Sequence, residues 1–291
     1  MMRATRNGTS SSTLLLDHPG WLRSAEGRVR RAFRLGEVAC TVTCEPVSER
    51  FAPTVALVRP TDVVALRLDA DGVDPTRLDV PAEFAAPLRA RGRVHRVCNP
   101  DLWDALVTAV LHQRTDHARQ RSTYQWLCET YGSRVPTEDG SALLLPTPSQ
   151  MATLPSIAMV RLSMGPRRCS FPTVAATYLE HGTRWALLPP AQLVTELKTI
   201  PGVGPWTAGL AVADFTNDYS FLPFADFAIS QWAANFLTTS TQPLEETEFA
   251  RMWRRAHGQQ LSMLTLLTLA WGVHHADGRP LWTDHNQQPL R

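Results

Sequence analysis

Two glycines, Gly202 and Gly204, frame Val203 between two stretches whose apolar spacing predicts helices. Pro201 and Pro205 flank these glycines, so the chain turns sharply and a second helix begins at once. A helix N-terminus carries unpaired N–H groups and a partial positive charge, and the missing Cβ of glycine lets an anion approach the backbone. The spacing therefore predicts a phosphate-binding turn. The alternative is a tight corner between two helices with no ligand.

The helices that carry this turn belong to a longer helical series. "NPDLWDALVTAVLHQ" predicts a helix capped by Asn99 or Asp101, and "TDHARQRSTYQWLCETYG" predicts a second one that stops at Gly132. Periodic apolar residues also predict helices over 149–154, 171–182, 190–200, 205–215, 226–237, 244–257 and 261–276. The last of these is apolar nearly all round, so we expect it inside a bundle.

The N-terminal part of the chain has a different period. Val38, Cys40, Val42 and Cys44 alternate with polar neighbours, which predicts a β-strand, and a helix is expected around Gly27 to Leu35. The fold class is therefore mainly α, with a small β-containing (α+β) N-terminal subdomain ahead of the helical bundle. The expected divisions are a disordered lead-in over 1–12, a β-rich subdomain over 13–95 and an all-α domain over 96–291.

Composition excludes several classes of protein. The chain has 291 residues, of which 44% are hydrophobic and 19% charged, and no apolar run approaches the ~20 residues that span a bilayer. We see no signal peptide and expect a cytoplasmic, nucleoid-associated protein. The five cysteines include no C-x-x-C pair, which argues against a disulfide scaffold, a structural zinc and an iron–sulfur cluster. Lys198 is the only lysine, so an amine nucleophile has one candidate besides the N-terminus.

"LKTIPGVGPWTA", followed by "YSFLPFADFAISQW", resembles the helix–hairpin–helix motif and the next loop of the base-excision DNA glycosylase superfamily. Within the superfamily the sequence is most similar to bacterial 3-methyladenine DNA glycosylase II. The resemblance covers roughly residues 97–275. It implies a monomer whose partner is double-stranded DNA containing damaged bases, and a role in base excision repair.

The resemblance also assigns roles to individual residues. It implies that Asp226 is the catalytic carboxylate, which stabilises the cationic sugar formed as the N-glycosidic bond breaks. Asp214 and Asp218 are nearby acids that rank lower. The residues implied to contact DNA are Gly202, Val203, Gly204 and Thr207 at the hairpin, with Gln113 and Arg114 in an earlier turn. Those implied to line the pocket for an extruded base are Trp206, Trp271, Phe224, Leu210 and Phe227.

Two departures from the family pattern accompany these roles: Arg114 replaces an apolar wedge, and Leu210 replaces a second pocket aromatic. Family members that also cut the strand use a lysine just after the hairpin glycines, where this chain has Trp206. The resemblance therefore implies base release without strand cleavage. An aromatic pocket favours a positively charged, alkylated purine.

No metal or organic cofactor is expected, apart from a monovalent cation that relatives hold at the hairpin carbonyls. Two alternatives stay open. The chain could be a non-catalytic DNA-binding or damage-sensing module, or a hydrolase of a free nucleoside or a specialised adduct.

Overall fold

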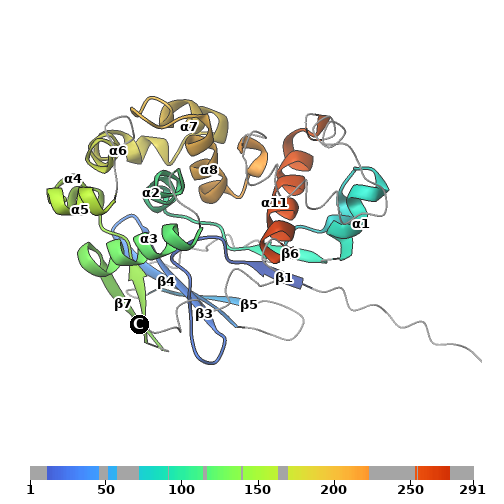
Figure 1. Ribbon diagram of the computed structural model, residues 1–291, viewed down its shortest axis with the longest axis horizontal. Coiled ribbons are helices and arrows are strands. Elements are labelled where there is room, and N and C mark those ends of the chain that lie inside the picture. Colours follow the sequence, from blue (N-terminus) through green and yellow to red (C-terminus); the bar gives the residue numbers. More distant parts are fainter. Residues whose placement is uncertain are drawn as a thin grey trace, which may run out of the picture. The chain divides into compact units, whose positions relative to one another are not determined.

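The computed structural model describes residues 12–45, 52–57, 72–90, 92–113, 117–138, 140–162, 170–222, 253 and 255–275. The chain forms two compact units that alternate along the sequence (Figure 1). We call the first the hairpin unit, which takes in the described residues of 16–70 and 96–223. The second, the α11 unit, takes in those of 1–15, 71–95 and 224–291. The sequence instead predicts one boundary near residue 96. No helix among the described residues is both long and apolar enough to cross a membrane.

An antiparallel sheet forms one layer of the hairpin unit. Its strands β2 (Leu22–Arg23), β3 (Val29–Leu35), β4 (Val38–Glu45) and β5 (Ala52–Leu57) lie in that order. Leu35 pairs with Val38, so β3 and β4 are joined by a two-residue turn in which Gly36 has a φ of +58°. Cys40, Val42 and Cys44 are buried on one face of β4, as the alternation predicts.

The helix expected around Gly27 to Leu35 is wrong, because β3 occupies this stretch. Val29, Arg31 and Phe33 alternate along the strand and are all buried. Arg31 is buried because it pairs with Asp104 on a helix. Because Arg31 is charged, the sequence of β3 does not show the alternation of apolar and polar residues that predicts a strand.

A second correction concerns the all-α prediction for 96–291. Strands β7 (Ser133–Thr137) and β8 (Gly140–Leu144) form an antiparallel pair inside this range. Val135, Ala142 and Leu144 form a small core with Ala32 of β3. The strands are short and β7 contains Pro136, which weakens the strand signal in the sequence.

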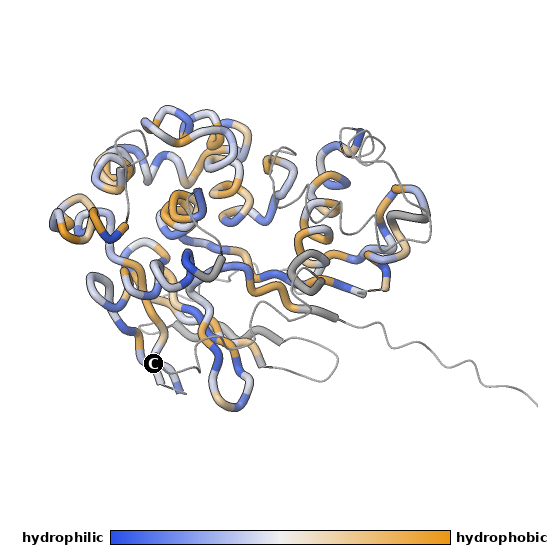
Figure 2. The backbone as a smooth tube through the Cα atoms, viewed as in Figure 1, coloured by the Kyte–Doolittle hydropathy of each residue, from blue (hydrophilic) through white to orange (hydrophobic). Residues whose placement is uncertain are grey.

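Helices form the other layer of the hairpin unit and its main core. They are α2 (Leu102–His112), α3 (His117–Tyr131), α4 (Pro148–Ala152), α5 (Ser156–Arg161), α6 (Phe171–Trp185), α7 (Pro190–Leu197) and α8 (Pro205–Thr216), followed by the 3₁₀ turn η2 (Tyr219–Phe221). Asp101 caps α2 by accepting from the N–H groups of Trp103 and Asp104. Residues 102–111 of α2 are all buried, and Figure 2 shows its hydrophobic character. Helix α2 packs against α8 and thereby supports the helix that follows the glycine turn.

The α11 unit has fewer described elements. These are β1 (Ser12–Leu15) paired with β6 (Arg93–Arg96), the 3₁₀ turn η1 (Pro75–Arg77), α1 (Ala82–Ala90) and α11 (Gly258–His275). The Gln260 side chain on α11 accepts from Asp79 N and donates to Arg77 O, both at 3.0 Å. Residues 263–268, 270 and 271 of α11 are buried, which confirms the burial expected from its all-round apolar character.

Candidate nucleic-acid interface

The turn between α7 and α8, residues 198–204, is the hairpin of this site. The N–H of Val203 donates to the carbonyl of Ile200 at 3.0 Å, with Pro201 and Gly202 at the two central positions. Gly202 has a φ of +86°, which favours glycine over any residue with a side chain. A proline followed by a left-handed glycine, closed by this hydrogen bond, is the arrangement of a type II β-turn. Pro201 and Gly202 are exposed.

The hairpin leaves several backbone donors available at the start of α8. Gly204 is the N-cap of α8 and has no side-chain capping bond, and Pro205 lacks an N–H. Among the described residues, no acceptor receives the N–H groups of Gly202, Gly204 or Thr207. A Cβ built on Gly204 would meet no atom within 4 Å, so the space beside this backbone is open. The geometry is that of an anion site at a helix N-terminus.

Two other hairpin residues point inward. Val203 is 4% exposed and belongs to the main core, and its N–H is already used in the turn. Thr207 is buried as well, with 2% of the residue exposed, and its hydroxyl accepts from Gln113 Nε2. The four hairpin residues that the resemblance implies for DNA contact therefore divide into two that are buried, Val203 and Thr207, and two glycines that lie at the surface.

Gln113 lies at the C-cap of α2 and reaches the hairpin. Its Nε2 donates to the carbonyl of Gly202 at 3.2 Å and to the hydroxyl of Thr207. The structure thus brings Gln113 together with the hairpin, a contact that the resemblance did not specify; its role at DNA stays a prediction. The next residue, Arg114, lies outside the described residues.

Trp206 stands in the first turn of α8 and is half-buried. Its ring lies against the ring of His112, with centroids 5.4 Å apart. The Nδ1 of His112 is 2.8 Å from the Oε1 of Gln120, whose Nε2 donates to the carbonyl of Thr108. Because a carbonyl only accepts, the orientation of the Gln120 amide is fixed, and Nδ1 of His112 must carry a proton. Trp206 therefore packs on an imidazole held in one tautomer.

The other predicted pocket residues are placed unevenly. Leu210 is half-buried and packs against the main core of the hairpin unit. Trp271, on α11, is 3% exposed. Phe224 and Phe227 lie outside the described residues, and so does Asp226, the implied catalytic carboxylate. The roles of all five stay predictions.

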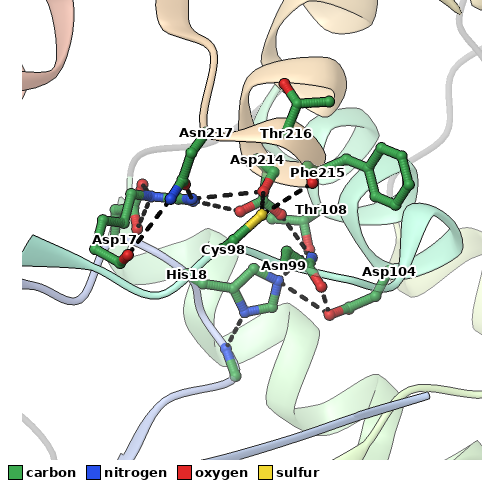
Figure 3. Close-up of polar contacts among 12 residues, drawn as sticks. Asp17, His18, Cys98, Asn99, Asp104, Thr108, Asp214, Phe215, Thr216 and Asn217 are labelled. Carbon is green, nitrogen blue, oxygen red and sulfur yellow. Dashed lines mark hydrogen bonds and ion pairs between the residues drawn. The ribbon is translucent and has the colours of Figure 1, made fainter. Parts of the chain in front are cut away.

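Below the hairpin, a network of buried charged side chains holds the far end of α8 (Figure 3). Arg96 is its first centre. Its Nε donates to both carboxylate oxygens of Asp17 at 3.1 and 3.0 Å, and its Nη1 donates to Asn217 Oδ1 at 2.7 Å. Its Nη2 pairs with Asp214 of α8. The guanidinium also lies 5.4 Å from the ring centre of Tyr219, whose hydroxyl donates to Asp17.

Asp104 of α2 is the second centre. It accepts from Arg31 at 2.6 Å and from Tyr124 at 2.8 Å. The Nδ1 of His18 accepts from the N–H of Gly20, so the proton of the neutral ring is on Nε2, which faces Thr108 at 3.0 Å and Asp104 at 3.3 Å. Burial disfavours the Asp104 carboxylate, but His18, Arg31 and Tyr124 outweigh it and hold its pKa well below the usual range.

Asn99 joins the two centres. Its amide donates to Asp214 at 2.7 Å and to Asp104 at 3.4 Å. Within the hairpin unit the network therefore ties α2 and α8 to β3, to Arg96 and to the segment at Asp17 and His18. It also gives Asp214 a structural role, and Asp218 caps η2 through Ser220. Sequence reasoning missed this network, although carboxylates inside the apolar runs "LWDALVTAV" and "AVADF" were a signal for it.

Comparison with known proteins bears on the fold. No protein-family model and no curated protein matches the sequence. Among solved structures, an 8-oxoguanine glycosylase/lyase from Clostridium acetobutylicum, in complex with DNA containing 8-oxoguanine, has a TM-score of 0.66 at 13% identity, covering 90% of each chain. A 3-methyladenine DNA glycosylase from Archaeoglobus fulgidus has a TM-score of 0.67 at 14% identity, covering 87% of this chain and 90% of that one. With the hairpin between α7 and α8, this chain therefore has the fold of the helix–hairpin–helix DNA glycosylases.

Proposed function

We propose that this chain is a DNA glycosylase that hydrolyses the N-glycosidic bond of alkylated purines, such as 3-methyladenine, in double-stranded DNA. The product is an abasic site in an uncut strand. The observation that carries the proposal is the hairpin, which presents the N–H groups of Gly202 and Gly204 at the start of α8, with no acceptor for them among the described residues, in a chain with this fold. The protein acts as a monomer in this account.

The hairpin suits a DNA phosphate better than it suits a base edge. Backbone N–H groups and the positive end of α8 attract an anion but carry no information about base sequence. Gly204 leaves the approach open because no side chain covers it. Phosphate binding of this kind suits a protein that must find damaged bases in any sequence context.

The chemical step needs a carboxylate beside the sugar. As the bond to the base breaks, positive charge develops on the deoxyribose, and a fixed negative charge stabilises that transition state. We assign this role to Asp226. Asp214 is unsuited to it because it is buried and paired with Arg96, and Asp218 is engaged with Ser220 N at 3.0 Å.

We also propose that the chain does not cleave the DNA strand by a lyase reaction. A lyase reaction through a Schiff base needs an amine at the sugar carbon, and the only lysine, Lys198, is exposed at the end of α7, ahead of the hairpin. Trp206 occupies the position after the glycines. One of the similar structures is a glycosylase/lyase, so the fold is compatible with either outcome, and the argument depends on the residues.

The substrate class follows from aromatic side chains and from charge. An alkylated purine carries a positive charge, which gains about 0.5–2 kcal/mol on an aromatic face over a neutral base and makes the base a better leaving group. Trp206, half-buried beside His112, is the described residue best placed to offer such a face. We assign Phe224, Phe227, Leu210 and Trp271 to the same pocket.

A monovalent cation at the hairpin also stays a proposal. It would be held by backbone carbonyl oxygens and would bridge them to a phosphate. Three hairpin carbonyls already accept hydrogen bonds: Ile200 from Val203, Gly202 from Gln113, and Gly204 from Ala208 at 3.0 Å. The remaining carbonyls are the candidates for such a site.

The test is a panel of duplex oligonucleotides, each with one 3-methyladenine, 7-methylguanine or 8-oxoguanine, incubated with protein and then treated with hot alkali. We expect strand scission at a methylated purine only after alkali. Reduction with borohydride should trap no covalent protein–DNA complex. Scission before alkali, or a trapped complex that Lys198→Gln abolishes, would overturn the monofunctional assignment. Tight DNA binding with no base release from any duplex would favour a non-catalytic module.

A further inference from the structure

The amide of Gln113 connects three segments that sequence separates. Gln113 is the C-cap of α2, and its amide contacts the carbonyl of Gly202 in the hairpin and the hydroxyl of Thr207 in the first turn of α8. Both contacts are made by Nε2, whose two hydrogens are thereby used inside the protein. This differs from the role that the family resemblance implies, in which Gln113 contacts DNA.

The contact with Gly202 has a consequence for the turn. The carbonyl of Gly202 and the N–H of Val203 belong to one peptide group. Gln113 binds its oxygen, and the carbonyl of Ile200 binds its nitrogen. This peptide is therefore held at both ends, next to the two glycine N–H groups that remain free. Since Gly202 has access to a wide range of φ values, an external restraint is what keeps it at +86°.

The chemistry of the contact can be read without ambiguity. A backbone carbonyl only accepts, so the atom of Gln113 that faces Gly202 has to be the amide nitrogen. A carboxylate at position 113 would place an oxygen against that carbonyl and could donate only when protonated. A leucine would remove the donor and introduce no charge.

We propose that Gln113 is a positioning residue, which holds the Gly202–Val203 peptide and the first turn of α8 in the conformation that binds phosphate. The inference rests on the proposed function, because it assigns Gln113 to the binding of DNA by the hairpin and leaves bond cleavage to another residue. It predicts that Gln113 affects the affinity for DNA far more than the rate of the chemical step.

Two variants test this, Gln113→Leu and Gln113→Glu, with Gln192→Glu as a matched control for added charge because Gln192 is exposed on α7. The probe is an undamaged, fluorescent duplex whose anisotropy is measured from pH 5 to 8. At pH 8 both Gln113 variants should bind about tenfold more weakly than the wild type, as expected for a lost donor and a carbonyl left unpaired. Acidification should restore binding in Gln113→Glu beyond any change in Gln192→Glu, whereas Gln113→Leu should show no recovery.

Kinetics separate positioning from general damage to the fold. Single-turnover base release by Gln113→Leu, at saturating protein, should stay within about threefold of the wild type, while the half-saturating protein concentration rises about tenfold. Thr207→Val combined with Gln113→Leu should weaken binding by less than the product of the two separate effects, since each substitution removes the same hydrogen bond between Gln113 and Thr207.

The outcomes divide cleanly. Wild-type affinity in both Gln113 variants, strict additivity with Thr207→Val, or a loss of rate equal to the loss of affinity would each overturn the inference while leaving the proposed function intact. If the wild type itself neither binds duplex DNA nor releases a base, the proposed function fails. If Gln113→Leu does not fold, the pH response of Gln113→Glu against Gln192→Glu decides the question.

Discussion

Replacing Arg96 by methionine should destabilise the hairpin unit more than the loss of a surface charge can. The substitution keeps most of the apolar stem and removes the guanidinium. Asp17 is 30% exposed and can be rehydrated, whereas the Asp214 side chain is 8% exposed and cannot. Removing one partner of a buried ion pair typically costs about 3–5 kcal/mol because the other charge is left uncompensated. We expect this loss in the free energy of unfolding.

Arg93→Met is the matched control. Arg93 pairs with Asp74 at 3.1 Å, and the two side chains are 40% and 25% exposed. Such a pair contributes about 0–1 kcal/mol. Urea unfolding followed by tryptophan fluorescence and by circular dichroism measures both variants against the wild type. Equal, small losses for Arg96→Met and Arg93→Met would refute the reasoning.

The effect of Arg96→Met should also depend on pH. Burial disfavours the Asp214 carboxylate, but Arg96 and the neighbouring donors outweigh this and hold the pKa of Asp214 below its ordinary value. A carboxyl with a lowered pKa stabilises the fold above its unfolded pKa, about 3.9, and this contribution is lost as pH falls through the folded pKa. Without Arg96, burial raises the pKa of Asp214, so the carboxyl of the variant takes up a proton at a higher pH than that of the wild type. The difference in stability between wild type and Arg96→Met should therefore be largest at neutral pH and should narrow as pH falls. A gap that is constant from pH 7 to 3 would contradict the account.

Three further predictions concern the hairpin and the network. Gly202→Ala should lower the free energy of unfolding by about 1–2 kcal/mol because the φ of Gly202 is +86°. Gly204 has a φ of −87° and open space beside it, so Gly204→Ala should leave stability nearly unchanged and weaken binding to duplex DNA; equal effects of the two variants on stability would contradict this. Lys198 is the C-cap of α7, next to the hairpin, so Lys198→Gln should reduce the slope of log affinity for duplex DNA against log salt concentration by about 0.9. Arg134→Gln is the control and should leave this slope unchanged, because β7 lies well apart from α7 in Figure 1. Tyr124→Phe should cost about 1–3 kcal/mol in urea unfolding because the buried Asp104 loses a donor, and a neutral result would argue against that contact.

The helical part of this fold was largely accessible from the sequence. The Asp101 cap, the apolar run of α2 and the Pro-Gly-Val-Gly-Pro turn are local signals, each set by neighbours within a few residues. These signals predict the positions of α2, α7 and α8, but not the contact between Gln113 and the hairpin. The N-cap and the glycines needed no knowledge of distant parts of the chain.

Strand β3 and the buried charged network escaped prediction for one physical reason, which is pairing between residues distant in sequence. Arg31 reads as a solvated charge until Asp104 is known to lie opposite it, and so β3 was mistaken for a helix. Arg96 likewise reads as surface until Asp17 and Asp214 are seen to surround it. Buried charges of this kind are specified by tertiary partners, which no local period reveals.

The most direct test of the account compares Asp226→Asn with Asp218→Asn on a duplex containing 3-methyladenine, with base release measured after hot alkali and binding measured by anisotropy. The account predicts that Asp226→Asn binds within a few-fold of the wild type and loses release by at least about 100-fold, as expected when a transition-state charge is left unstabilised. Asp218→Asn should bind and release the base as the wild type does. Undiminished release by Asp226→Asn would contradict the assignment of the carboxylate, and with it the central claim.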